Sequence, residues 1–215
     1  MRYDTVIFDL DGTLLDTLSD LAAAVNQTMR AFGHPEHSAE AVCSMVGNGI
    51  PMLVRRALPP DAEHFEEILS YYKAYYGEHA NDHTCPYEGV EEMLQALAAA
   101  GVKQAILSNK ADPFVKELNA RYFSCWIEKA VGEKQEVRPK PWPDSVLAIM
   151  QEYGCDPART LYVGDSEVDV LTAQNAGVDC ASVCWGFRTE EQLRKAGAQH
   201  LFHHPQELAA FNLEK

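Results

Sequence analysis

From about residue 85 onward, short apolar segments alternate with segments of helical periodicity, and this alternation restricts the possible folds more than any other feature. Runs such as Val102 to Leu107 and Asp179 to Val183 are almost continuously apolar. Strands of this kind need cover on both faces, and strands that alternate with helices pair in parallel. We therefore predict the α/β class, with a doubly wound parallel sheet.

The expected elements follow from apolar spacing and from glycines that close helices. Strands are expected at residues 4–10, 102–107, 126–131, 160–163, 179–183 and 198–202. The helices between them are expected at residues 89–100, 112–122, 143–153, 167–176 and 189–196.

The segment after the first strand has a different pattern, with helical spacing and no strand signal. Helices are expected at residues 16–32, 38–46, 50–57 and 62–78, followed by a linker at 80–88. We therefore predict an α/β core made of residues 1–13 and 85–215. A small all-helical domain, residues 14–84, is inserted after the first strand.

Charge excludes several classes of partner. The formal charge is −14, which disfavours nucleic acid and anionic membranes. No apolar run is long enough to cross a bilayer, and the first residues lack the pattern of a signal peptide, so a cytoplasmic location is expected. An anionic substrate would need cations placed locally in its site.

Polar residues follow the carboxyl ends of several expected strands, where open parallel sheets bind their ligands. These residues are Asp9, Asp11, Ser108, Asn109, Lys140, Asp165 and Asp169. Each one alone is also an ordinary turn or helix-cap residue. Four loops that converge on one edge of one sheet are better explained by a shared site.

The chemistry of these residues suits a phosphate ester. Gathered carboxylates repel one another, and a hard cation such as Mg²⁺ relieves that repulsion. Lys140 adds a fixed positive charge that offsets the overall acidity. Phosphoryl transfer requires mainly positioning and charge neutralisation, and a carboxylate can serve as the nucleophile.

Four segments resemble the motifs of the haloacid dehalogenase superfamily of phosphohydrolases, in the same order and across nearly the whole chain. They are Phe8 to Thr17, Leu107 to Lys110, Arg138 to Pro141, and Val163 to Asp169. The resemblance implies a Rossmann-like core, and the helical insert resembles the small cap of that family. The hinges would lie at residues 13–17 and 80–88.

The resemblance also implies roles for the acidic residues. Asp9 would be the nucleophile and a Mg²⁺ ligand. Asp11 would be the general acid and base, and its backbone carbonyl would bind the metal. Asp165 would be a further metal ligand, while Asp169 would act through a metal-bound water or through Lys140.

The remaining motif residues would bind substrate. Ser108 and Lys140 would hold the transferred phosphoryl group, with Asn109 in support. Trp142 departs from the pattern, because a small residue is usual there; it would either change the packing near Lys140 or cover the loop.

Two further segments are similar to phosphoglycolate phosphatases, namely residues 46–58 and 185–198. A glycine at a helix N-terminus followed by an arginine can receive a carboxylate, so Gly49 and Arg55 are candidate substrate contacts. The alternative is that the arginines at positions 55 and 56 are solvated. Phosphoglycolate is thus the best single substrate prediction.

Other readings remain open. A β-phosphoglucomutase-like enzyme, a pyrophosphatase, a broad sugar-phosphate phosphatase and a catalytically silent phosphate-binding protein share the core motifs. Asp11 argues against dehalogenation, and Lys73, deep in a tyrosine-rich helix, argues against a Schiff-base phosphonatase. The protein is expected to be a monomer or a homodimer.

Histidines and cysteines suggest no second site. Residues 200, 203 and 204 are histidines, but no acid-thiol cluster accompanies them in the sequence, so a metal role is not expected. The six cysteines contain no C-x-x-C pair, which disfavours a zinc ribbon.

Overall fold

The computed structural model describes residues 1–47 and 49–214 of the chain. The chain divides into two compact units. One unit contains Met1–Leu14 and Pro86–Lys215, and the other contains Leu15–Cys85.

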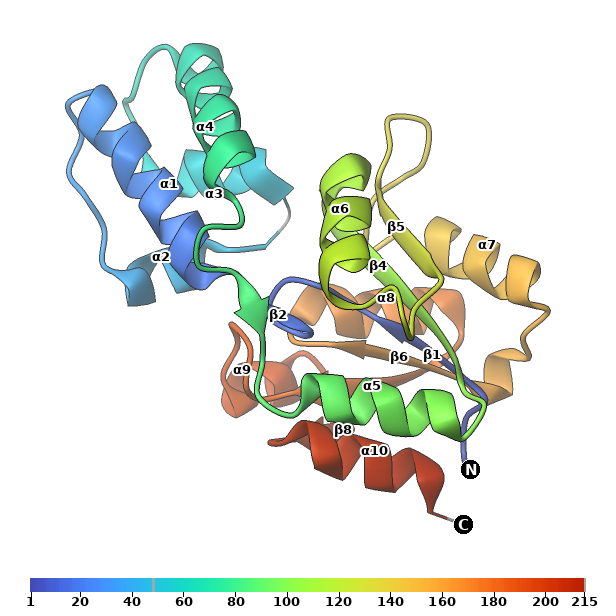
Figure 1. Cartoon of the computed structure of the whole chain (residues 1–215). Helices are drawn as coiled ribbons and strands as arrows, with labels where there is room; N and C mark the ends of the chain where they lie inside the picture. Colours follow the sequence, from blue (N-terminus) through green and yellow to red (C-terminus); the bar gives the residue numbers. More distant parts are fainter. Residues whose placement is uncertain (48, 215) are drawn as a thin grey trace. The chain divides into compact units, whose positions relative to one another are not determined.

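The first unit is built on a six-stranded sheet of order β5-β4-β1-β6-β7-β8, in which every pair is parallel (Figure 1). Its strands are β1 (Thr5–Phe8), β4 (Lys103–Ala111), β5 (Lys129–Glu133), β6 (Thr160–Gly164), β7 (Asp179–Val183) and β8 (His200–Phe202). From β1 the chain adds β4 and β5 on one side of the sheet, and then β6, β7 and β8 on the other side of β1. The direction in which strands are added therefore reverses at β1. A ligand crevice is expected at such a switch point, beyond the carboxyl end of β1.

Both faces of this sheet are covered, as the continuous apolar strands predict. On one face Ile7, Ala105 and Tyr162 lie in register and pack against α7 and α8. On the other face the side-chain amide of Gln104 donates to Leu94 O of α5. The helices of this unit are α5 (Val90–Ala99), α6 (Asp112–Tyr122), α7 (Asp144–Tyr153), α8 (Glu167–Ala176), α9 (Glu190–Lys195) and α10 (Pro205–Leu213), with a 3-10 turn at Pro157–Arg159. The doubly wound fold class is confirmed.

The second unit is helical. It contains α1 (Leu18–Ala31), α2 (Ala39–Met45), α3 (Gly49–Ala57) and α4 (Phe65–His79). Buried apolar residues on different helices, such as Val25 of α1, Leu53 of α3 and Tyr72 of α4, supply its core. Among the described residues, no helix has both the length and the apolar character needed to cross a membrane.

A buried carboxylate fixes the segment that follows α4. Asp20 accepts hydrogen bonds from the backbone N–H groups of His83 and Thr84, and from the Thr84 hydroxyl. Burial would raise the pKa of Asp20, but these hydrogen bonds outweigh it, so the pKa lies below its ordinary value. Asp20 thereby ties α1 to the returning chain.

The chain leaves and re-enters the first unit at adjacent points. The short strands β2 (Leu15–Asp16) and β3 (Cys85–Pro86) pair as a two-stranded ribbon. The Tyr87 N–H donates to Leu14 O at 3.2 Å.

Four features differ from the sequence-based predictions, and the ribbon of β2 and β3 is the first of them. The strand expected at residues 126–131 is β5, Lys129–Glu133, because the N–H groups of Trp126 and Ile127 both bond to Phe123 O and close α6. β4 runs on to Ala111 after an irregularity in its pairing. Helix α10 was not predicted, although Pro205 at its start and Glu207 in its first turn are helix-start signals.

Candidate active site

Asp9 directly follows β1, at the switch point of the sheet. Its N–H donates to Val163 O of β6 at 2.8 Å, so the backbone remains fixed beyond the end of the strand. The side chain is buried. Burial raises the pKa of Asp9 to about 7, although the neighbouring Lys140 acts in the opposite direction.

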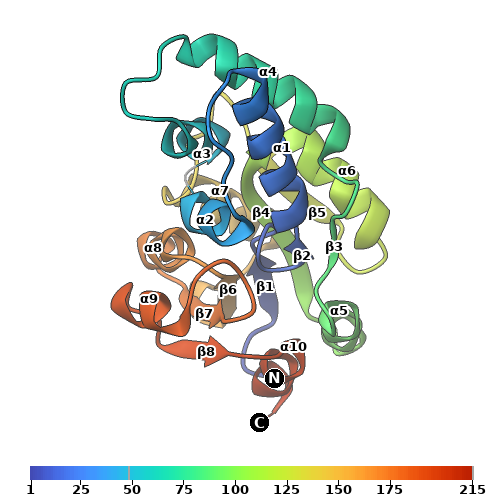
Figure 2. The same cartoon turned by 90° about the vertical axis from the view of Figure 1, so that its left-hand side faces the viewer.

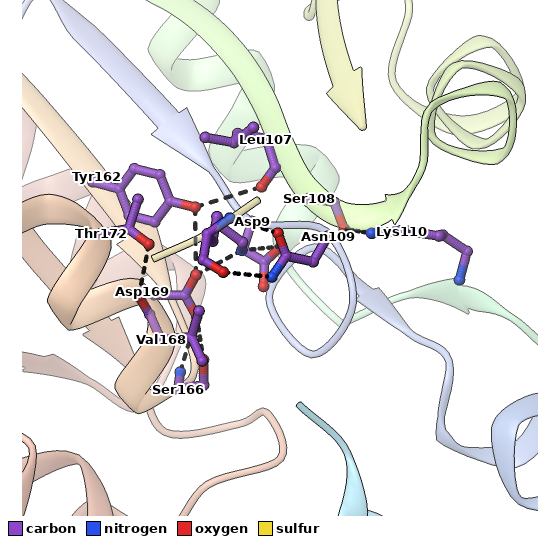
Figure 3. Close-up of polar contacts among 11 residues, drawn as sticks. Asp9, Leu107, Ser108, Asn109, Lys110, Tyr162, Ser166, Val168, Asp169 and Thr172 are labelled. Carbon is purple, nitrogen blue, oxygen red and sulfur yellow. Dashed lines mark hydrogen bonds and ion pairs between the residues drawn. The ribbon is translucent and has the colours of Figure 1, made fainter. Parts of the chain in front are cut away.

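Lys140 is buried between two carboxylates. Its ammonium group lies 2.8 Å from Oδ1 of Asp9 and 2.8 Å from Oδ1 of Asp169 (Figure 3 shows these two acids). Burial alone would lower the pKa of Lys140, but Asp169 and Asp9 outweigh it and hold the pKa well above its ordinary value. The site therefore contains a permanent cation.

Asp169 is held from several sides. Its Oδ2 accepts from the Ser166 backbone N–H at 3.1 Å and from the Ser166 hydroxyl at 2.6 Å, which forms a capping box at the start of α8. Its Oδ1 faces both Lys140 and the Tyr162 hydroxyl, which is 3.4 Å away (Figure 3). Both oxygens of Asp169 thus have protein partners, which suits a residue that positions Lys140.

Three buried carboxylates come together at this edge. One oxygen from each of Asp9, Asp165 and Asp169 lies within 4.8 Å of the others. Burial, followed by the charges of Asp169 and Asp9, raises the pKa of Asp165 well above its ordinary range. Such a cluster of oxygen donors fits a hard divalent cation, which would remove the electrostatic cost of keeping the carboxylates ionised.

Asp11 points to a different partner. Its Oδ1 lies 2.9 Å from the ammonium group of Lys110, which is itself buried. Lys110 belongs to the second motif, yet sequence reasoning assigned it no role. The Lys110 N–H also donates to Ser108 Oγ at 3.1 Å, so one residue links the predicted acid/base Asp11 with the predicted phosphate-binding Ser108.

Asn109 secures the lysine loop. Its amide group donates to Lys140 O at 3.0 Å, and its carbonyl accepts from the Lys140 N–H at 2.8 Å. Trp142, further along the loop, is 51% exposed, and its ring lies 4.3 Å from the guanidinium carbon of Arg138. Trp142 therefore covers the loop from the solvent side.

Residues 185–188 form a further wall of the site, and sequence reasoning did not foresee their contact with Asp165. The Phe187 N–H donates to Asp165 Oδ2 at 2.7 Å, and the Trp185 indole donates to Thr13 O at 2.9 Å. A Cβ on Gly186 would lie 2.6 Å from Asp165 Oδ2, so only glycine allows this close approach. Gly186, between Trp185 and Phe187 in the sequence, was the signal that could have predicted this close approach.

The candidate substrate contacts Gly49 and Arg55 belong to the helical unit. Gly49 starts α3 with a φ of 81°, which glycine adopts without strain. The guanidinium of Arg55 stacks on Phe65, 3.5 Å from the ring centre. Arg56 has a local role instead, because it donates to Met45 O and Gly47 O.

Comparison with protein families matches residues 6–183 to the haloacid dehalogenase-like hydrolases. The phosphoglycolate phosphatase of Pseudomonas putida is 38% identical over 193 residues, which cover 85% of this chain and 70% of that protein. Phosphoglycolate phosphatase 1 of Pseudomonas aeruginosa is 39% identical over the same shares of both chains.

Solved structures agree with these relatives. A crystal structure of a phosphoglycolate phosphatase candidate from Lactobacillus delbrueckii subsp. bulgaricus superposes with a TM-score of 0.95. The two chains are 31% identical, and the match covers 100% of each.

Proposed function

Because the chain belongs to the haloacid dehalogenase-like hydrolase family, we propose that it is a Mg²⁺-dependent phosphomonoesterase whose substrate is 2-phosphoglycolate. The observation that carries this proposal is the position of Lys140, which lies between Asp9 and Asp169 with Asp165 in the same carboxylate cluster. A buried cation beside a carboxylate nucleophile provides a site for an anionic phosphoryl group in an otherwise acidic protein.

Asp9 and Asp11 divide the chemistry between them. An oxygen of Asp9 attacks phosphorus, the ester P–O bond breaks, and Asp11 gives its proton to the leaving alkoxide. Asp11 then takes a proton from water, whose oxygen attacks phosphorus. The bond between phosphorus and the Asp9 oxygen breaks, inorganic phosphate leaves, and the Asp9 carboxylate is regenerated. The Lys110 ammonium group, 2.9 Å from Asp11 Oδ1, holds the Asp11 carboxyl group in place for both proton transfers.

We propose that Mg²⁺ is held by Asp9, by Asp165 and by the backbone carbonyl of Asp11. When bound, it neutralises charge on the phosphoryl oxygens and on the surrounding carboxylates. The Phe187 N–H donates to Oδ2 of Asp165, and this hydrogen bond fixes the orientation of the carboxylate.

The phosphoryl group itself is bound by Lys140 and Ser108, and Asn109 keeps the lysine loop in place. Ser108, Asn109 and Lys140 line one small pocket at the end of β4. Hydrogen-bond donors aimed at the equatorial oxygens stabilise the charge that develops during transfer.

The choice of substrate rests on the named relatives and on the helical unit, which we propose acts as a cap. Arg55 presents the flat face of its guanidinium to Phe65, so its N–H groups remain directed in the plane of the group. Such an arginine, with the helix start at Gly49, is suited to a carboxylate like that of phosphoglycolate.

The test is a panel of phosphate esters assayed for phosphate release with Mg²⁺ and with a chelator. We expect phosphoglycolate to have the highest kcat/KM, and the chelator and Asp9→Asn each to abolish turnover. Asp156→Asn, at an exposed turn residue, is the matched control and should retain full activity. Sugar-phosphate interconversion that is faster than phosphate release would instead identify a mutase.

A further inference from the structure

A second cluster of potential metal ligands lies at the edge of the sheet that is formed by β7 and β8. Cys184, Glu190 and His203 each offer one ligand atom, and these atoms lie within 4.8 Å of one another. The histidines near residue 203 have no acid-thiol partners nearby in the sequence. The fold supplies both partners, from segments 13 and 19 residues away.

Strand register brings the first two residues together. Strands β7 and β8 lie side by side (Figure 2). Val183 pairs with Phe202, so Cys184 and His203 are the next residues along these two parallel strands. The Cys184 N–H donates to Phe202 O at 2.8 Å and extends the ladder by one bond. Residues paired in register project to the same face of a sheet, which places the thiol beside the imidazole.

Helix α9 supplies the third ligand in a fixed orientation. Oε1 of Glu190 is bound by Arg194, with the two atoms of the guanidinium at 2.6 and 2.8 Å. Oε2 of the same carboxylate lies 3.3 Å from Nε2 of His203. An outer partner that holds one oxygen while the other faces the ligand cluster is a usual arrangement in metal sites.

We propose that Cys184, Glu190 and His203 bind a thiophilic divalent cation of the Zn²⁺ type. One sulfur, one nitrogen and one oxygen ligand suit Zn²⁺, which commonly takes three protein ligands and leaves one position open. Mg²⁺ prefers oxygen ligands alone, so the two sites select different metals.

Binding exchanges a proton for the metal. The Cys184 thiol loses its proton to solvent as the sulfur–metal bond forms. Burial, and then the charge of Glu190, raises the pKa of Cys184, so this proton is present at neutral pH. Cys184 and Glu190 are partly exposed and His203 is exposed, which gives the ion a path of entry.

The site would also stiffen a loop of the candidate active site. Cys184 and Glu190 are the two ends of the segment whose middle residue, Phe187, donates to Asp165. A cation shared by both ends would fasten this segment to β8.

The experiment is a Zn²⁺ titration of the full-length protein against a chelating dye, with Mg²⁺ in large excess so that the carboxylate cluster is saturated. We expect one Zn²⁺ per chain, and an affinity that falls at least about tenfold in Cys184→Ser and in His203→Ala. Cys125→Ser removes an exposed thiol elsewhere, and His204→Asn removes the neighbouring imidazole while keeping a helix-capping side chain. Both controls should bind as the wild type does.

Co²⁺ substitution supplies an independent readout. A thiolate ligand produces a sulfur-to-cobalt charge-transfer absorption, which should be present in the wild type and absent in Cys184→Ser. Urea unfolding in chelator checks that each variant is folded. Equal Zn²⁺ affinity in Cys184→Ser and wild type, or Co²⁺ binding without the thiolate absorption, would overturn the proposal. Neither result depends on phosphatase activity.

Discussion

Lys140 Nζ lies 2.8 Å from Oδ1 of Asp169, and both side chains are buried. Removing the charge of Asp169 leaves the buried ammonium group with less compensation. We expect Asp169→Asn to lower the free energy of unfolding by about 3 kcal/mol, as is typical when one partner of a buried pair is lost. Urea denaturation measures this loss. The exposed pair Lys195–Glu191 is the control: Glu191→Gln should change stability by less than about 1 kcal/mol.

We propose Asp11 as the proton donor, and a donated proton matters only when the leaving group needs it. Asp11→Asn should therefore lower kcat about 10²- to 10⁴-fold on alkyl phosphates such as phosphoglycolate. For an aryl phosphate, whose leaving group is acidic, the rate of leaving-group release should fall much less. Rapid-quench measurement of the first phosphoryl transfer checks this difference. Equal losses on both esters would contradict the assigned role.

Metal removal should reverse the usual response of stability to pH. The folded-state pKa of Asp9 is about 7, above its unfolded value of 3.8, so the folded protein binds the extra proton between these limits. Stability from this group is present at low pH and is lost as pH rises through 7. In chelator we expect a fall on the order of 1 kcal/mol per pH unit between about pH 5 and 7, which levels off above pH 7, relative to Asp9→Asn.

Mg²⁺ provides the control for that experiment. A bound cation compensates the ionised carboxylates, so the difference in slope between wild type and Asp9→Asn should disappear in saturating Mg²⁺. Urea midpoints from pH 5 to pH 8, with and without the metal, give the answer. A wild-type slope identical in both conditions would show that Asp9 does not contact the ion.

Asp20 should hold residues 80–86, the segment that follows α4, in a fixed conformation. Asp20→Asn weakens charge-assisted hydrogen bonds from His83 and Thr84, so a loss of about 2 kcal/mol is expected in the stability of this unit. Because the folded pKa of Asp20 is depressed, its contribution is present above the unfolded pKa and is lost as pH falls through the folded value.

Limited proteolysis tests this prediction locally. Cleavage within residues 80–86 should accelerate in Asp20→Asn. Asp82→Asn, which removes an exposed partner of His79, should leave the cleavage rate nearly unchanged. Equal rates in the wild type and Asp20→Asn would remove the assigned structural role.

The main elements of the fold were predictable because each carries its own local signal. Apolar runs bounded by glycines predicted β7 and α8 at the bounds that the structure has. β5 was displaced, because aromatic and apolar residues at 126 and 127 complete the end of α6 instead of starting a strand. A short apolar run does not distinguish these two uses.

The candidate site was predictable to the level of strand ends. The motif residues at those positions fall where parallel strands terminate together, which is a consequence of topology. The Lys110–Asp11 ion pair and the Phe187 contact to Asp165 were not foreseen. Both depend on how distant loops lie beside one another, and spacing along the chain carries no such information. The Cys184 cluster was missed for the same reason.

Leu14 and Tyr87 are joined by one hydrogen bond, although 72 residues separate them in the chain. The chain therefore enters the helical unit and returns from it at adjacent backbone positions. Any insert whose two ends meet at that spacing satisfies the same backbone bond and leaves the strand ends undisturbed. Such a junction lets natural selection or an engineer exchange the helical unit while the strand ends that carry the carboxylates stay unchanged.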